Sequence, residues 1–188
     1  HSHTDHITGM DKIINKYKPR ALIDPEIPSS TDTFEKLLDA VYTNRVKYNL
    51  EPAQKFKLGP LVINLNRPKN KLDENSDPNH NSVVFKLEFG KIAFLFPGDI
   101  DGTREDQLIR TTKNQLNANL LKVSHHGSLH GTTAGFIQAV NPQVTIISCG
   151  KDNQYGYPHQ ETINTLTIAK IQIYRTDTNG TVLVKTDG

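Results

Sequence analysis

The first six residues, His-Ser-His-Thr-Asp-His, carry four side chains that can bind a metal ion: His1, His3, Asp5 and His6. Imidazole and carboxylate together suit Zn²⁺, and also Mn²⁺ or Fe²⁺, whereas Ca²⁺ and Mg²⁺ prefer shells made only of oxygen. Side chains alternate along an extended segment, so His1 and His3 face the same way and Asp5 can follow. His6 has to be turned inward by a bend or by the start of a helix. The run therefore predicts one short segment that supplies two neighbouring metal ions.

The alternative is a tag remnant or a solvated polar terminus. A tag normally repeats histidine, whereas this run contains an aspartate and continues into Ile7-Thr8-Gly9-Met10, which is typical of folded protein.

Length and composition set further bounds. The 188 residues suffice for a single domain, residues 1–188, with a sizeable core. A net charge of +2 is too small to indicate nucleic-acid binding by itself. The single cysteine, Cys149, excludes an intrachain disulfide and a cysteine-rich zinc site. No apolar run approaches the ~20 residues of a membrane span, although a signal or membrane segment upstream of His1 stays open.

Periodicity predicts strands that alternate with helices, so we expect a mixed α/β layered domain. A hairpin turning at Gly90-Lys91 is the most regular part, and a polar surface loop is predicted over 67–81. Helices are predicted over 10–18, 33–49, 103–116, 133–140 and 160–169, and strands over 21–23, 61–65, 82–89, 92–96, 120–123, 144–148, 171–174 and 181–184.

Further polar side chains follow apolar strands, where rigid sites are often built. Asp99 follows one strand, His125 and His126 follow another, and His159 lies in the loop after a third. Each has a plain alternative: a turn aspartate, a polar turn, or a neighbour of a helix start. Together with the opening run they predict a two-metal hydrolase, in which Asp99 bridges the ions and a metal-bound hydroxide is the nucleophile.

These residues resemble the metallo-β-lactamase superfamily, which has an αββα sandwich fold. The resemblance rests on the opening run, the Pro97-Gly98-Asp99 turn and the later histidine loops. More narrowly, the chain resembles the C-terminal domain of the ComEC family of competence proteins. That likeness rests on 81–84, 94–100, 121–128, 155–159, 175–177 and Gly180, and so covers nearly the whole chain.

The resemblance implies a role for each candidate residue. His1 and His3 would bind the first metal, Asp5 and His6 the second, and Asp99 both. One of His125 and His126 would add a further ligand and His159 another. Asp5 would also be catalytic, by holding or deprotonating the attacking water, and Arg175 and Thr176 would contact a phosphate. A ComEC-like protein would carry a membrane channel domain upstream and work on the periplasmic or extracellular face; otherwise the chain would be cytoplasmic.

Three features depart from the superfamily pattern. Its first strands would precede His1, so the chain looks N-terminally truncated. Asn81 and Ser82 stand where many relatives have a metal-binding histidine, although His80 could substitute. Tyr157 replaces a histidine in the last motif. Weaker binding of one ion is therefore open.

Three functions remain open on the sequence alone. The first is a phosphodiesterase or nuclease acting on DNA, for which Lys55, Lys57, Arg67, Lys69 and Lys71 could contact phosphates or could simply form a solvated loop. The second is a hydrolase of small esters, lactones or phosphocholine-type substrates. The third is a degenerate, non-catalytic metal-binding or interaction domain, which the intact opening run argues against. The oligomeric state stays open.

Overall fold

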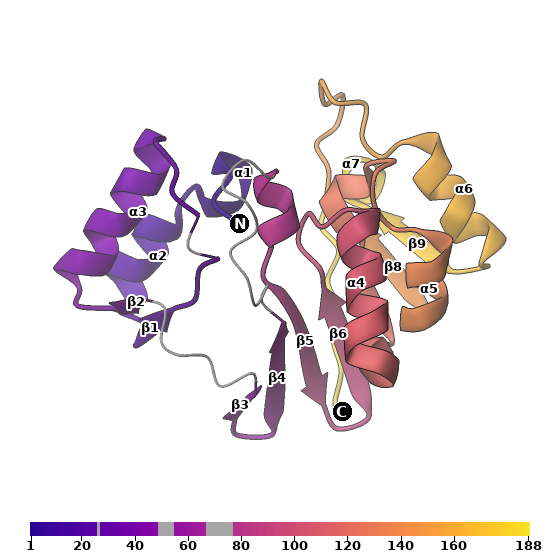
Figure 1. Ribbon diagram of the computed structural model, residues 1–188, viewed down its shortest axis with the longest axis horizontal. Coiled ribbons are helices and arrows are strands. Elements are labelled where there is room, and N and C mark those ends of the chain that lie inside the picture. Colours follow the sequence, from indigo (N-terminus) through magenta and orange to yellow (C-terminus); the bar gives the residue numbers. More distant parts are fainter. Residues whose placement is uncertain (26, 49–54, 67–76) are drawn as a thin grey trace.

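Two sheets organise the chain in the computed structural model, which describes residues 1–25, 27–48, 55–66 and 77–188 (Figure 1). A seven-stranded sheet has the order β3-β4-β5-β6-β7-β8-β9, and β1 and β2 form a separate two-stranded sheet. The predicted mixed α/β class is therefore confirmed.

The strand pairing of the large sheet changes from antiparallel to parallel at β6. Its antiparallel half consists of β3 (Lys55–Leu58), β4 (Leu61–Asn66), β5 (Val84–Phe89) and β6 (Ile92–Phe96), each paired with the next. From β6 onward the pairing is parallel, through β7 (Leu120–Lys122), β8 (Val144–Ile147) and β9 (Gln172–Arg175). Parallel strands need helical crossovers. These are α4 (Gly102–Thr112) with η2 (Lys113–Leu116), α5 (Ala134–Val140) and α6 (Gln160–Ile168).

The main core lies between these helices and the parallel half of the sheet. Leu108 of α4, Phe136 of α5 and Leu166 of α6 are all fully buried against the strand residues Leu121 and Ile147. The parallel strands and their crossovers therefore form the best-packed part of the molecule, and all of β6, β7 and β8 end at the same edge.

A second hydrophobic cluster holds the N-terminal part together, to the left in Figure 1. The N-terminal part comprises α1 (Thr4–Ile7), α2 (Met10–Tyr17), β1 (Ala21–Leu22), α3 (Asp32–Thr43) and β2 (Lys47–Tyr48). Ile7, Ile14, Phe34 and Leu37 are buried in it. The N-cap of α3 is Thr31, whose hydroxyl accepts a hydrogen bond from Phe34 N.

Two predicted elements are wrong. The helix predicted over 33–49 ends at Thr43, because the Asn44 side chain donates to Ala40 O and to Asn15 Oδ1, and the chain then pairs with β1 as β2. No strand forms over 181–184; α7 (Thr176–Asn179) follows β9 directly, and the chain runs on until Gly188 lies against the turn at Gly90.

The loop predicted over 67–81 lies outside the described residues except for 77–81, which contains η1 (Pro78–Asn81). Of the helices described, none is both long and apolar enough to cross a membrane. The single seven-stranded sheet with helices packed on it is compatible with one half of an α/β sandwich.

The fully buried Glu105 ties α4 to the start of α5. Its two carboxylate oxygens accept hydrogen bonds from Thr132 N, at 2.5 Å, and Thr133 N, at 2.8 Å. Glu105→Gln turns an amide N–H toward one of these donors, so we expect a loss of about 1–3 kcal/mol in the free energy of unfolding.

Chemical denaturation measures this loss. The matched control is Asp106→Asn, an exposed carboxylate on the same helix, which should leave the stability unchanged. Equal stability of Glu105→Gln and the wild type would contradict a structural role for this carboxylate.

Candidate metal centre

Four of the predicted metal-binding residues meet at one point. Ligand atoms of Asp5, His6, Asp99 and His126 all lie within 4.8 Å of one another. His6 Nε2 lies 3.0 Å from Asp99 Oδ2 and 3.4 Å from Asp5 Oδ2. His126 Nε2 lies 3.1 Å from Asp5 Oδ2 and 3.4 Å from Asp99 Oδ2. Two imidazoles and two carboxylates in this arrangement form a donor set suited to Zn²⁺.

Helix α1 turns His6 toward the cluster. The helix begins at Thr4, where the N–H groups of His6 and Ile7 both donate to His3 O. Buried Ile7 holds this single turn against the N-terminal core. The helix start thus supplies the bend that an alternating strand could not, and it leaves His3 exposed at the N-cap.

Asp99 is placed by the turn after β6. Gly98 has φ +66°, and a Cβ there would lie 2.7 Å from Ser82 Cβ. Ser82 Oγ accepts a hydrogen bond from Asp99 N. Burial alone would raise the pKa of Asp99, but hydrogen bonds from His126 and His6 outweigh it and hold the pKa far below its usual range. The carboxylate is therefore ionised and available to cations.

His1 lies on the other side of Asp99. Its ring is 1 % exposed, its Nδ1 lies 3.0 Å from Ser82 Oγ, and its Nε2 lies 3.8 Å from Asp99 Oδ2. Both His1 Nε2 and Asp99 Oδ1 are buried without a hydrogen-bond partner among the described residues. The His3 ring lies 4.5 Å from the His1 ring, centroid to centroid. Buried polar atoms normally have partners, so these two unpaired atoms fit a cation on this side of Asp99.

The His126 ring is oriented by a backbone contact. Its Nδ1 lies 2.8 Å from Ser148 O, at the end of β8. A carbonyl can only accept, so Nδ1 carries the proton and donates, and in the neutral ring Nε2 offers its lone pair toward Asp5 and Asp99. This is the tautomer that a metal ligand needs.

Two other predicted ligands lie outside the cluster. His125 Nε2 is 3.2 Å from the Tyr157 hydroxyl. His159 lies at the start of α6, and its Nδ1 accepts a hydrogen bond from Leu129 N. Tyr157 itself stacks on His126, with ring centroids 6.1 Å apart. His80, the possible substitute, pairs with Asp101 instead. Of the two adjacent histidines, the structure thus brings only His126 to the cluster.

The predicted phosphate contacts have partners of their own. Arg175 donates to both carboxylate oxygens of Asp177, and the Thr176 hydroxyl donates to Cys149 O while accepting from Cys149 N. Sequence reasoning missed Ser82 as the residue that links His1 to Asp99. Its position beside Asn81, directly before an apolar strand, was the signal that could have found it.

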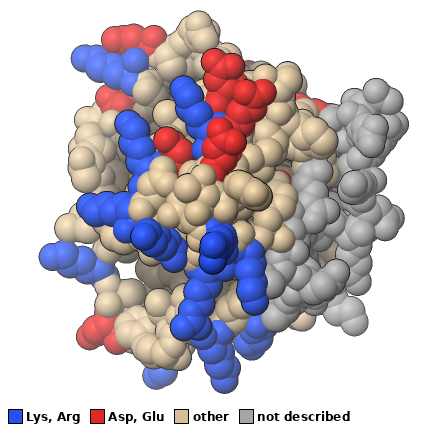
Figure 2. Space-filling view, turned by 90° about the vertical axis from the view of Figure 1, so that its left-hand side faces the viewer, with Lys and Arg blue, Asp and Glu red and all other residues tan. Residues whose placement is uncertain are grey.

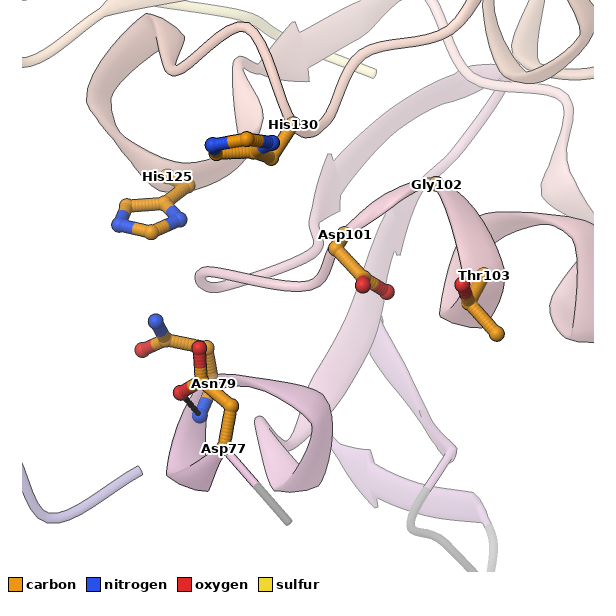
Figure 3. Close-up of a pocket in the computed structure, with 7 residues that line it drawn as sticks. All are labelled: Asp77, Asn79, Asp101, Gly102, Thr103, His125 and His130. Atoms are coloured by element: carbon orange, nitrogen blue, oxygen red, sulfur yellow. Dashed lines mark hydrogen bonds between the residues drawn. The ribbon is translucent and has the colours of Figure 1, made fainter.

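A cavity of about 480 Å³ opens beside the cluster (Figure 3). The His125 and His130 rings lie on one side of it, Asp77 and Asn79 lie opposite, and Asp101 lies on a third side. The His125 ring lines this cavity and lies 6.2 Å from the His126 ring, centroid to centroid, so a group bound beside His125 lies close to the cluster.

Replacing Gly98 tests how Ser82 supports the site. In Gly98→Ala the new Cβ forces Ser82 to move, which loosens its contacts with His1 and Asp99. We expect metal affinity to fall about tenfold or more, as for other outer-sphere supports. Competition with a chromogenic zinc chelator measures the affinity.

Gly59→Ala is the matched control, because Gly59 has φ +59° but nothing within 4 Å of its added Cβ. It carries the same backbone strain without the clash and should keep wild-type metal affinity. An equal loss of affinity in both variants would rule out the Ser82 contact as the cause.

Metal-induced stabilisation should grow with pH. Hydrogen bonding to Asp99 raises the pKa of His126 from 6.5 despite its burial. In the metal-free protein, the protonated ring therefore contributes stability below pH 6.5. This stability is lost as the pH rises through the raised pKa. Metal needs the neutral ring. The rise in melting temperature caused by ZnCl₂ should therefore increase from about pH 6 to about pH 8.

A His126→Gln variant should flatten this trend, and His130→Ala should leave it unchanged. A zinc-induced rise in melting temperature that is the same at every pH in the wild type would contradict the prediction.

No family model matches the chain. The chain is 30 % identical to ComE operon protein 3 of Bacillus subtilis over 97 % of its length and 23 % of that protein. It is 26 % identical to Recombination protein 2 of Haemophilus influenzae over 98 % of its length and 21 % of that protein. It is 32 % identical to Competence protein ComA of Neisseria gonorrhoeae over 57 % of its length and 16 % of that protein. The chain thus spans about a quarter or less of these relatives, and their names support a relationship to ComEC-type competence proteins.

Proposed function

We propose that the chain is a metal-dependent phosphodiesterase of the metallo-β-lactamase fold that cleaves DNA. The observation that carries the proposal is the convergence of Asp5, His6, Asp99 and His126, from three distant segments, on one point. A solvated polar terminus would have no reason to meet a buried aspartate and an oriented histidine. The proposal of this fold is supported by the mixed sheet and by the order of these motifs along it.

Two Zn²⁺ ions fit the donors best, with Mn²⁺ or Fe²⁺ as alternatives that accept the same ligand types. Asp5, His6, His126 and Asp99 would hold one ion, and His1, His3 and Asp99 the other. When bound, such ions lower the pKa of a water molecule and stabilise negative charge on a phosphoryl or carbonyl oxygen.

The protein side chains then divide the remaining work. Asp99 is 4 % exposed and anchored, so it holds position. The Asp5 side chain is 60 % exposed, with Oδ2 within 3.4 Å of both His6 and His126. It can therefore reach solvent, which suits it to orient an incoming water molecule and to accept a proton from it.

DNA as substrate is favoured by the relatives, which are named for competence and recombination. On this proposal the chain is the hydrolytic part of a longer DNA-uptake protein that also carries a membrane channel domain.

A second candidate keeps the same chemistry on a small molecule. Asp77 and Asp101 line the cavity beside the cluster, and two carboxylates repel a polyanion but attract a cation. A phosphocholine-type ester has a cationic headgroup of suitable size, so this observation favours a small-substrate hydrolase.

One panel separates the candidates. The purified chain is incubated with Zn²⁺ or Mn²⁺ and with single-stranded DNA, duplex DNA, a simple aryl ester and a phosphocholine ester. The proposal expects DNA cleavage, and Asp99→Asn should lower its rate at least about a hundredfold, because the variant keeps the shape but loses the charge that both ions share.

Asp106→Asn provides the control, since this exposed carboxylate on α4 lies outside both the cluster and the cavity, and the variant should retain most of the rate. Cleavage of an ester without cleavage of DNA would replace the first candidate by the second. Full activity of Asp99→Asn, or less than trace metal in a protein that has been supplied with zinc, would refute both.

A further inference from the structure

Basic side chains gather at one end of the N-terminal part of the molecule. Five exposed residues lie there: Lys16, Lys18, Arg20, Arg45 and Lys47. Figure 2 shows that most basic side chains of this face gather on its lower half and most acidic ones on its upper half. We call these five residues, with Tyr17 and Tyr42, the helix-end surface.

The fold brings the five together. Helices α2 and α3 pack against each other, and Asn44 Nδ2 donates to Asn15 Oδ1 at 2.7 Å where both helices end. Strands β1 and β2 then run parallel, with Lys47 N donating to Arg20 O. Residues that follow the two helices are thereby held at the same edge.

No ion pair found among the described residues involves any of these five side chains. The acidic residues of α3 lie in its first two turns, at Asp32, Glu35 and Asp39, away from Arg45. The helix-end surface therefore presents positive charge to solvent, although the whole chain is nearly neutral.

Helix dipoles explain part of this pattern, because cations are favourable near helix C-termini. They do not explain Arg20 and Lys47, which lie beyond the helices, or the two tyrosines. Tyr17 is 65 % and Tyr42 is 87 % exposed, and the amine of Lys16 lies 5.1 Å from the centre of the Tyr17 ring. Exposed aromatic faces among unpaired cations are the combination that binds single-stranded nucleic acid, because bases stack on the rings while phosphates pair with the cations.

We infer that the helix-end surface is a docking site for a single-stranded polynucleotide, separate from the metal centre. The inference rests on the proposed function for its choice of DNA. A hydrogen-bond path joins the two sites: Tyr48 of β2 donates to Asp24 Oδ1, and Ser2 Oγ donates to Asp24 Oδ2. Ser2 lies between His1 and His3, so a strand held on this surface approaches the cluster from the β2 side.

Binding is tested without cleavage, in EDTA, by fluorescence anisotropy with a labelled 20-nucleotide single strand. Neutralising Lys16, Arg20 and Lys47 to alanine together should weaken binding and reduce the slope of log affinity against log salt by about 2, because each phosphate that is no longer neutralised lowers the slope by about 0.7. The matched control neutralises three exposed cations elsewhere, Arg110, Lys151 and Lys185, and should keep the wild-type slope.

The tyrosines are tested separately. Tyr17→Ala and Tyr42→Ala should each weaken single-strand binding about fivefold or more, while the phenylalanine variants, which keep the ring, should bind as the wild type does. Circular dichroism verifies that each variant is folded.

Three results would overturn the inference: equal behaviour of the triple variant and its control, no effect of the tyrosine variants, or tighter binding to anionic phosphatidylserine vesicles than to DNA through the same residues.

Hydrolysis of a small aryl phosphodiester by the triple variant separates the docking proposal from the proposed enzyme function. Unchanged hydrolysis together with loss of DNA binding supports both, and unchanged hydrolysis with unchanged DNA binding overturns only the docking surface. Binding without any hydrolysis in the wild type overturns only the enzyme.

Discussion

Asp99 carries a negative charge at the end of β6, where 4 % of its side chain is exposed. Taking a carboxylate out of water is costly unless it is paired and hydrogen-bonded. The cost is offset here by the imidazoles of His6 and His126, while Ser82 Oγ accepts a hydrogen bond from the Asp99 backbone N–H and holds the residue in position. Each partner comes from a different segment, so the buried charge requires α1, the turn before β5 and the loop after β7 to converge. The parallel pairing of β6, β7 and β8 makes this possible, because strands that run the same way end at one edge.

Much of this arrangement could be predicted from local sequence. Asp99 and the His125-His126 pair follow apolar strands directly, and the amphipathic helices and the hairpin at Gly90 follow from periodicity alone. The choice between His125 and His126 could not be predicted, because both residues have positive φ in the same short turn. That choice depends on Ser148, which fixes the His126 ring from another strand. The end of α3 was missed for a similar reason: Asn44 ends the helix through Asn15, a partner 29 residues earlier.

The two sides of Asp99 are unequal. One side has two imidazoles, His6 and His126, whose Nε2 atoms each lie within 3.4 Å of the second carboxylate, Asp5. The other has the buried His1 ring, the exposed His3 and the Ser82 hydroxyl. A hydroxyl is a weaker ligand than an imidazole for Zn²⁺. If both sides bind metal, the His1 side is the weaker, and loss of Ser82's hydrogen bonds affects that side first.

The charge around the cluster constrains how a polyanion can be held. Asp77 and Asp101 line the adjoining cavity and the Asp5 side chain is largely exposed, so the immediate surroundings oppose a phosphate backbone until cations are bound. The affinity for a long strand must then come from elsewhere on the molecule. Within the described residues, the cations at the ends of α2 and α3 include Lys47, and its neighbour Tyr48 shares the Asp24 carboxylate with Ser2 of the His1–His3 segment. On the proposed function, separating the charge that binds the strand from the charge that binds the metal would allow an almost neutral chain to do both, because neither set would cancel the other.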